Sequence, residues 1–175
     1  MADVPDIPRP SQLWKALSPE RRQRAAAAFW SDDNASMEQT EAVLAIANRI
    51  KFRVSSVVRM PREKKVRHLA LMPGVSEVVA ARLLVVYHLD EQRPMMSRFL
   101  DAAGLKHQDG LIEEEELAAP PADRLQEAVR AIAASHPPED VALYLSTLVW
   151  QDPETWGGLA EVPESRMPAA VPSGP

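Results

Sequence analysis

Proline constrains this chain more than any other residue type. Sixteen prolines stand against six glycines in 175 residues. The proline ring fixes φ and removes the backbone N–H, so proline fits the first turn of a helix and disrupts a helix interior or a central strand. Several internal prolines are followed by glutamate, which favours a helix start, as in Pro19-Glu20 and Pro138-Glu139. The chain is therefore predicted to form short helices that begin at prolines.

Apolar residues spaced three and four apart extend these starts into helices. The longest alternating pattern, which would suit a strand, is only Phe52 to Val58. The fold class is predicted to be all-α, a single compact bundle of about seven or eight short helices. The first predicted helix covers 18–30, and the second is capped by Asp32, Asn34 or Ser36 and includes 43–50. The next helices are predicted at 61–72, 77–88, 94–104 and 122–134. A long helix begins at Pro137, and a final helical turn begins at Asp152.

Length and proline placement also predict the domain organisation. A chain of 175 residues is typical of one domain. Prolines cluster at both ends, where they favour extended, mobile chain. The prediction is a flexible segment at residues 1–10, a helical domain at 11–160 and a disordered Pro-rich tail at 161–175.

Composition excludes several classes of protein. The absence of cysteine excludes a disulfide framework, thiolate metal sites and a cysteine nucleophile. The most apolar run, Leu83 to Leu89, lies between Arg82 and Asp90 and is far shorter than the roughly 18 to 20 residues that span a bilayer. The acidic N-terminus does not resemble a secretory signal. We expect no membrane association and a cytoplasmic location.

A run of cations stands out in a chain whose formal net charge is -5. Between positions 51 and 67 the only acidic residue is Glu63. Such a segment either binds an anionic partner or pairs with an acidic patch of the protein. The stretch from Asp109 to Asp123, which includes Glu113 to Glu116, is such a patch, and it could pair with the cations of the same molecule or of the other chain in a dimer. Both alternatives stay open. The cations are Lys51, Arg53, Arg59, Arg62, Lys64, Lys65 and Arg67.

The segment from Leu71 to Leu84 resembles the helix-hairpin-helix motif of non-specific DNA-binding proteins. Pro73 and Gly74 match its hairpin, and Ser76 stands where the motif has a second glycine. The resemblance implies two helices joined by this turn, with backbone N–H groups at the start of the second helix binding a phosphate. The basic neighbours that would assist it are Arg59, Arg62, Lys64, Lys65, Arg67 and Arg82.

The same segment also resembles ubiquitin-associated three-helix modules. Met72-Pro73 and Leu83-Leu84 match the loop and the helix end that form their contact surface. That resemblance implies a protein partner. A third interpretation is structural, in which Pro73-Gly74 ends one helix and Ser76 caps the next.

No pattern predicts catalysis or metal binding. The four histidines lie far apart in sequence, and no nucleophile elbow, phosphate-binding loop or metalloprotease motif is present. The consecutive glutamates from Glu113 to Glu116 do not match the alternating ligands of a calcium-binding loop. We predict no catalytic, cofactor-binding or metal-binding residues, and therefore no cofactor. We also expect Trp30 and Trp150 to close helices over the core, with indole N–H groups that need partners.

These observations predict a non-enzymatic helical binding or adaptor protein that engages a protein partner or itself. The alternative is a nucleic-acid-binding protein that uses the basic helix and the hairpin. A second alternative is an enzyme whose site forms only in three dimensions. The predicted binding residues are Arg59, Arg62, Lys64, Lys65, Arg67, Pro73, Gly74, Ser76 and Arg82.

Overall fold

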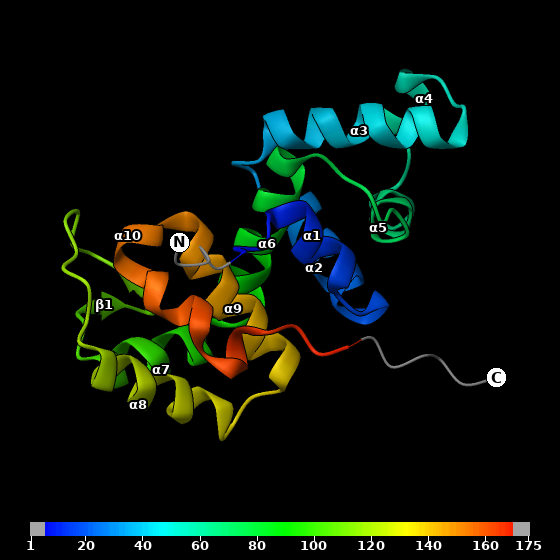
Figure 1. The fold of residues 1–175 in the computed structure, drawn as a ribbon. Coiled ribbons are helices and arrows are strands. Elements are labelled where there is room, and N and C mark those ends of the chain that lie inside the picture. The colour runs from blue at the N-terminus through cyan, green and yellow to red at the C-terminus, as the bar shows by residue number, and fades with distance from the viewer. Residues whose placement is uncertain (1–5, 170–175) are drawn as a thin grey trace. The chain divides into compact units, whose positions relative to one another are not determined.

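The computed structural model describes residues 6–169, and helices dominate them (Figure 1). Ten α-helices, two short 3-10 helices and one two-stranded hairpin are formed within this range. The predicted helical class is confirmed, but the helix count exceeds the predicted seven or eight. None of the described helices has both the length and the apolar composition needed to cross a bilayer.

The chain divides into two units. The N-terminal unit is Pro10–Glu91, and the C-terminal unit comprises Gln92 onward together with the segment before Pro10. The predicted single domain over 11–160 stays a prediction, because this division does not test whether either unit folds alone. Residues 1–5 and 170–175, at the predicted mobile ends, lie outside the described residues.

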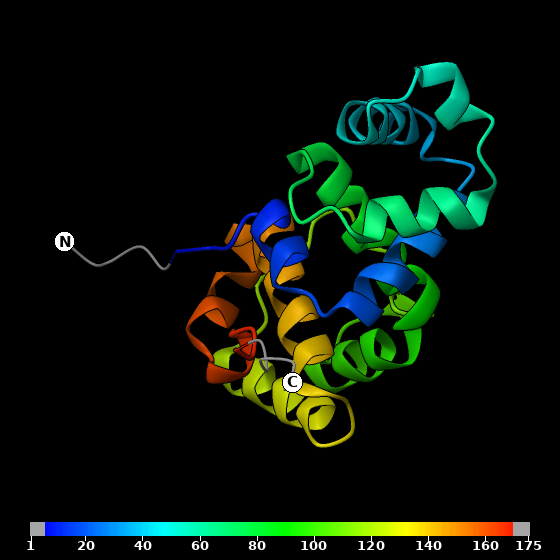
Figure 2. The ribbon, with the colours of Figure 1, turned by 90° about the vertical axis from the view of Figure 1, so that its right-hand side faces the viewer.

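Six helices build the N-terminal unit. Helix α2 packs against α5 and α6, while α1 packs against α6 and α3 contacts α4, α5 and α6 (Figures 1 and 2). Trp14, Phe29, Ile46, Leu69 and Leu83 are fully buried among these helices. The bounds are α1 Pro10–Ala16, α2 Pro19–Ser31, α3 Ser36–Ile50, α4 Val54–Val58, α5 Arg62–Ala70 and α6 Glu77–Glu91.

Capping explains where α2 and α3 begin and end. The hydroxyl of Ser18 accepts a hydrogen bond from the backbone N–H of Arg21, as its position before Pro19 predicts. Helix α3 begins after Ala35 with no side-chain cap, which differs from the predicted caps at Asp32, Asn34 or Ser36. It ends at Lys51, which has a left-handed conformation with φ 58°, and the N–H of the next residue donates to the oxygen of Ala47 at 3.1 Å.

Helix α1 is a helix that the sequence did not predict. No acidic residue lies in its first turn, so its own sequence favours a helix only weakly. Tertiary contacts hold it instead. The indole Nε1 of Trp14 donates to the backbone oxygen of Met72 at 2.8 Å, and the backbone N–H and hydroxyl of Ser11 donate to the carboxylate of Glu77 at 3.1 Å and 2.5 Å.

Helix α4 also lies where the sequence predicted no helix. The alternating sequence from Phe52 to Val58 would suit a strand, but the structure places a five-residue helix over Val54–Val58. Only Val57 of that helix is buried. An isolated strand would leave its backbone groups unpaired, and no neighbouring strand is available in this unit. A single helical turn pairs part of that backbone internally.

The C-terminal unit is arranged around α9. Every residue from Asp140 to Val149 is buried, and α9 contacts α8, α10, η1 and η2, while α7 packs against α8. Phe99 places its ring edge-on to Tyr144 at 5.4 Å between centroids, and burial raises the pKa of Tyr144 above its ordinary value. The bounds are α7 Arg93–Ala103, β1 His107–Gln108, β2 Leu111–Ile112, α8 Ala122–Ala133, α9 Pro138–Gln151, α10 Pro153–Trp156, η1 Gly157–Glu161 and η2 Pro163–Ser165.

The tail that was predicted to be disordered from residue 161 differs at its start. Pro163–Ser165 forms η2 and packs against α9. The hydroxyl of Ser146 donates to the backbone oxygen of Ser165 at 3.0 Å, and both serines are buried. Proline content alone predicted mobility, whereas these contacts bind the segment to the helix that forms the core.

A short hairpin joins α7 to the loop before α8. Its turn residues Asp109 and Gly110 both have positive φ, 50° and 86°, which is typical of a tight hairpin turn. The Nδ1 atom of His107 accepts from the backbone N–H of Gly110 at 3.1 Å, so the proton lies on Nε2, which donates to Asp101 at 2.8 Å. His107 therefore holds the turn in place.

Candidate partner-binding groove

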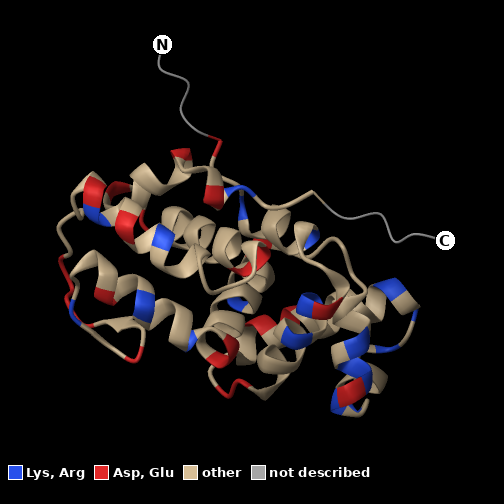
Figure 3. Ribbon diagram, turned by 90° about the horizontal axis from the view of Figure 1, so that it is seen from below, with Lys and Arg blue, Asp and Glu red and all other residues tan. Residues whose placement is uncertain are grey.

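The basic run of the N-terminal unit flanks α4 on both sides and continues along α5. Figure 3 shows Lys and Arg gathered on this part of the unit. Six of the seven cations are exposed, and Lys65 is half-buried. Within the N-terminal unit, all of which the structure describes, none of the seven forms an ion pair. The glutamates from Glu113 to Glu116 belong to the other unit, so their pairing with the basic run stays a prediction.

The two units carry opposite charge. The N-terminal unit contains thirteen Lys and Arg against nine Asp and Glu, a formal net charge of +4. The C-terminal unit contains seven against sixteen, a formal net charge of -9. The net charge of the whole chain therefore conceals a basic unit that can attract an anionic partner.

An open groove lies beside this basic run, between α3, α4, α5 and the end of α2. Its cavity measures about 330 Å³, within the range of known binding clefts. The lining combines apolar surface, uncharged polar groups and two cations, a combination that can hold an acidic ligand with an apolar side chain. The lining residues are Trp30, Ser36, Gln39, Thr40, Val43, Val54, Val58, Arg62 and Lys65.

Trp30 connects the apolar and basic parts of the groove. Its side chain is 8% exposed, and the ammonium nitrogen of Lys65 lies 5.0 Å from the ring centroid. This cation–π contact holds the ammonium group at the groove. The Nε1 atoms of Trp30 and Trp150 have no hydrogen-bond partner among the described residues, so the expected partners are missing for both.

Uncharged polar contacts fix the end of the groove where α2 meets α3. The side-chain amide of Gln39 donates to the backbone oxygens of Phe29 at 2.8 Å and of Asp32 at 2.9 Å. The hydroxyl of Thr40 donates to the oxygen of Ser36 at 2.8 Å. Gln39 thus ties α3 to the last turn of α2, which positions Trp30 opposite α5.

Exposed apolar side chains lie among the cations. Phe52 is 56% exposed and Val58 is 57% exposed, and Val54 is also exposed one helical turn before Val58. Val54 and Val58 line the groove, whereas Phe52 follows Lys51 at the end of α3. Apolar side chains grouped at a surface and rimmed by charge are typical of contact surfaces.

The predicted hairpin residues lie between α5 and α6. The hydroxyl of Ser76 accepts from the backbone N–H of Val79 at 3.3 Å and so caps α6. Gly74 has no positive φ, and a Cβ there would meet no atom within 4 Å. The carboxylate of Glu77, which binds Ser11, lies in the first turn of α6. These contacts match the structural interpretation of the turn, because a capping serine and an acidic group already interact with the start of α6.

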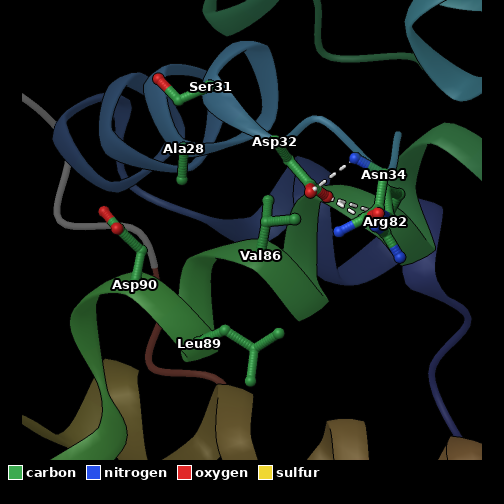
Figure 4. Close-up of a pocket in the computed structure, with 8 residues that line it drawn as sticks. All are labelled: Ala28, Ser31, Asp32, Asn34, Arg82, Val86, Leu89 and Asp90. Atoms are coloured by element: carbon green, nitrogen blue, oxygen red, sulfur yellow. Dashed lines mark hydrogen bonds and ion pairs between the residues drawn. The ribbon is translucent and has the colours of Figure 1, made fainter. Parts of the chain in front are cut away.

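Arg82 does not join the basic run. Its Nε and Nη2 atoms donate to Oδ2 of Asp32 at 2.9 Å and 2.6 Å, and Oδ1 of Asp32 accepts from the backbone N–H of Asn34 at 3.0 Å. Figure 4 shows this ion pair at the edge of a second cavity of about 250 Å³, beside α2 and α6. Because Arg82 and Asp32 neutralise each other, this cavity offers no free cation.

The structure therefore separates the nine predicted binding residues. It brings Arg62 and Lys65 to one groove, with Arg59, Lys64 and Arg67 on the same exposed run. It places the hairpin residues at the α5–α6 turn and Arg82 in an ion pair. Sequence reasoning missed the apolar wall, since its residues come from three helices; only the spacing of Val54 and Val58 inside the basic run could have indicated it.

Other features of the described residues do not form a second candidate. From residue 6 to residue 169, no group of three or more His, Asp or Glu side chains could hold a metal ion. A third cavity of about 220 Å³, beside α8 and η2, has one cation, Arg130, and one acidic residue, Glu164, in its lining. Its charges are balanced, and its ligand class is not indicated.

Comparison with known proteins gives no relative. No family model matches the sequence, and neither the curated proteins nor the solved structures include a significant match. The function is therefore inferred from the residues of the groove and their surroundings.

Proposed function

We propose that this chain is a non-enzymatic binding module whose groove engages an acidic segment of a partner protein. The observation that supports this proposal is the juxtaposition of four apolar side chains with Arg62 and Lys65 in one open groove. The apolar wall would bury a partner side chain, and the cations would attract and orient carboxylates. A partner that supplies both is a peptide segment in which leucine or isoleucine lies beside glutamate.

A nucleic acid is the second candidate, and one observation favours it. Phe52 is exposed between Lys51 and Arg53, and a base could stack on its ring while the cations bind phosphates. Two features of α6 favour a protein partner instead. Glu77 lies at the start of α6, where a hairpin of the helix-hairpin-helix type would bind phosphate, and Arg82 is already paired with Asp32. The four apolar side chains of the groove also suit a partner side chain better than a phosphate.

Fluorescence anisotropy with the full chain tests the proposal. The probe is a labelled peptide of alternating leucine and glutamate, titrated at low salt. We expect saturable binding, because the peptide supplies both chemical features that the groove complements. Reversing two charges, Arg62→Glu with Lys65→Glu, should weaken binding at least tenfold, which corresponds to about 1.4 kcal/mol.

A matched charge reversal outside the groove is the control. Lys15 on α1 is exposed and belongs to the same unit, so Lys15→Glu changes the charge as much as Arg62→Glu or Lys65→Glu alone, without touching the groove. It should leave binding within about twofold, since Lys15 does not line the groove and an exposed charge acts weakly through water. Retention of duplex or single-stranded DNA, with no peptide binding, would contradict the protein-partner proposal and support the second candidate.

A further inference from the structure

An acidic segment of the C-terminal unit has the chemistry that the groove requires. Residues 111–117 read Leu-Ile-Glu-Glu-Glu-Glu-Leu. The segment begins in β2 and then continues without helix or strand to the start of α8. Leu111 is 44% exposed, and the glutamates from Glu113 to Glu116 are all exposed. None of the four forms an ion pair with the described residues of its own unit.

The hairpin presents this segment from a fixed base. Gly110 packs so closely on α7 that an added Cβ would lie 2.8 Å from the Cβ of Met96. His107 bonds both the turn and Asp101 of α7, as described above. Leu111 pairs directly with Gln108 across the hairpin. A segment that leaves a rigid hairpin loses less conformational entropy on binding than a free tail would.

The groove and the segment are complementary in charge and in apolar content. The groove offers Val43, Val54 and Val58 beside Arg62 and Lys65, and the segment offers an exposed leucine followed by four carboxylates. The cations and the glutamates both lack ion-pair partners in their own units. The formal charges of the two units, +4 and -9, favour the same pairing.

We propose that the groove of one copy of this chain binds the 111–117 segment of a second copy, an inference that depends on the proposed function. The contact joins two different surfaces, so it is heterologous and joins copies head to tail into a ring or an open chain. The exposed Leu111 contacts the valine wall, and the glutamates lie along the basic run. Each carboxylate paired with a cation makes the association sensitive to salt.

A charge-swap experiment on the full chain tests this inference. The groove variant is Arg62→Glu with Lys65→Glu, and the segment variant is Glu114→Lys with Glu115→Lys. Sedimentation equilibrium at low salt measures the weight-average mass against concentration. The unsubstituted chain should rise above the monomer mass of 19.4 kDa as concentration increases. Each variant alone should associate at least tenfold more weakly, because its like charges then face each other.

The decisive sample is the equimolar mixture of the two variants. A groove that now carries glutamates accepts a segment that carries lysines, while the other pair keeps its native charges. Association should therefore return in the mixture, and also in a chain that carries all four substitutions. Lys15→Glu and Glu161→Lys, both at exposed positions outside the two surfaces, should associate like the unsubstituted chain. Circular dichroism verifies that every variant keeps its helices.

Three results would overturn the inference. One is a monomer mass at every concentration, another is unchanged association of either variant, and the third is a mixture that stays monomeric. The peptide titration separates this failure from failure of the proposed function. If the chain stays monomeric but binds the leucine–glutamate peptide through Arg62 and Lys65, the proposed function stands and only the second copy is refuted as the partner of the groove. If the chain neither associates nor binds the peptide, both the proposed function and this inference are refuted.

Discussion

Gly110 and Gly74 both lie in turns, but only one of them requires glycine. Gly110 has φ 86° and lies against Met96 and the backbone oxygen of Arg93. Gly74 has no positive φ and open space where a Cβ would be placed. A side chain is therefore tolerated at position 74, before α6, whereas the hairpin of the C-terminal unit requires a residue without a side chain at position 110.

Alanine at these two positions should have different effects. Gly110→Ala should lower the free energy of unfolding by about 1 to 3 kcal/mol, because the new methyl group meets Met96 in a strained backbone conformation. Gly74→Ala should change it by less than about 0.5 kcal/mol. Urea unfolding followed by circular dichroism measures both. Equal effects of the two substitutions would contradict the described geometry.

Asp152 is a second residue with a local role that can be measured. Its side chain accepts a hydrogen bond from the backbone N–H of Thr155 at 3.2 Å and caps α10. Hydrogen bonds from the side chain and backbone of Thr155 lower the pKa of Asp152. A lowered pKa means that the carboxylate stabilises the folded chain above its unfolded pKa, and that this contribution disappears as pH falls through the folded pKa.

Replacing this carboxylate should alter the response to acid. Asp152→Asn keeps a capping oxygen but cannot titrate, so the variant should lose less stability than the unsubstituted chain when the pH falls from about 5 to about 2. Unfolding midpoints in urea across that range test the difference. Glu161→Gln, at an exposed site, is the control. Identical acid sensitivity of the Asp152→Asn variant and the unsubstituted chain would contradict the role of the cap.

At the scale of elements, local signals in the sequence predicted most helices correctly. Ser18 before Pro19, the proline before α5 and the glycine after α7 all fix the ends that were expected, and Gly104 has the left-handed conformation that favours glycine at a helix end. Helices α1 and α4 were missed because local sequence does not determine them. Trp14 and Ser11 hold α1 through contacts with Met72 and Glu77, more than fifty residues away.

The candidate site was predicted only where it is continuous in sequence. The cations of α5 were recognised as a group, and the structure keeps them together. The apolar wall was not recognised, because Trp30 and Val43 reach it from helices that precede the basic run. Arg82 was grouped with the cations, although its guanidinium forms an ion pair with Asp32, fifty residues earlier. Sequence proximity therefore indicated charge but could not show which charges were already paired.

The end of α3 offers a test of an element boundary. Lys51 has a left-handed conformation that a β-carbon disfavours, so Lys51→Gly should stabilise the chain by about 1 kcal/mol. Arg53→Gly removes the same charge at a residue with φ -69°, where glycine brings no conformational gain. Thermal unfolding of the two variants compares them. A gain of equal size at Arg53 would mean that charge removal, and not the helix end, is the cause.

For the whole molecule, the separation of charge between the two units is the central property. A net charge of -5 would discourage an anionic partner if it were evenly distributed, but the N-terminal unit has a formal charge of +4. The account therefore predicts that binding of the leucine–glutamate peptide falls at least tenfold between about 50 and 500 mM salt, because ions screen the basic run. Binding that is indifferent to salt would show that the apolar wall acts alone.

Chemical-shift mapping of the full chain, titrated with the leucine–glutamate peptide, tests the binding groove most directly. The indole N–H of Trp30 reports from the groove wall, and the amides of Val54, Val58 and Lys65 report from its rim. The account predicts that these signals move together and saturate, while the amides around Gly74 and Ser76 stay in place. Movement at the α5–α6 turn with no change at Trp30, or no movement anywhere, would contradict it.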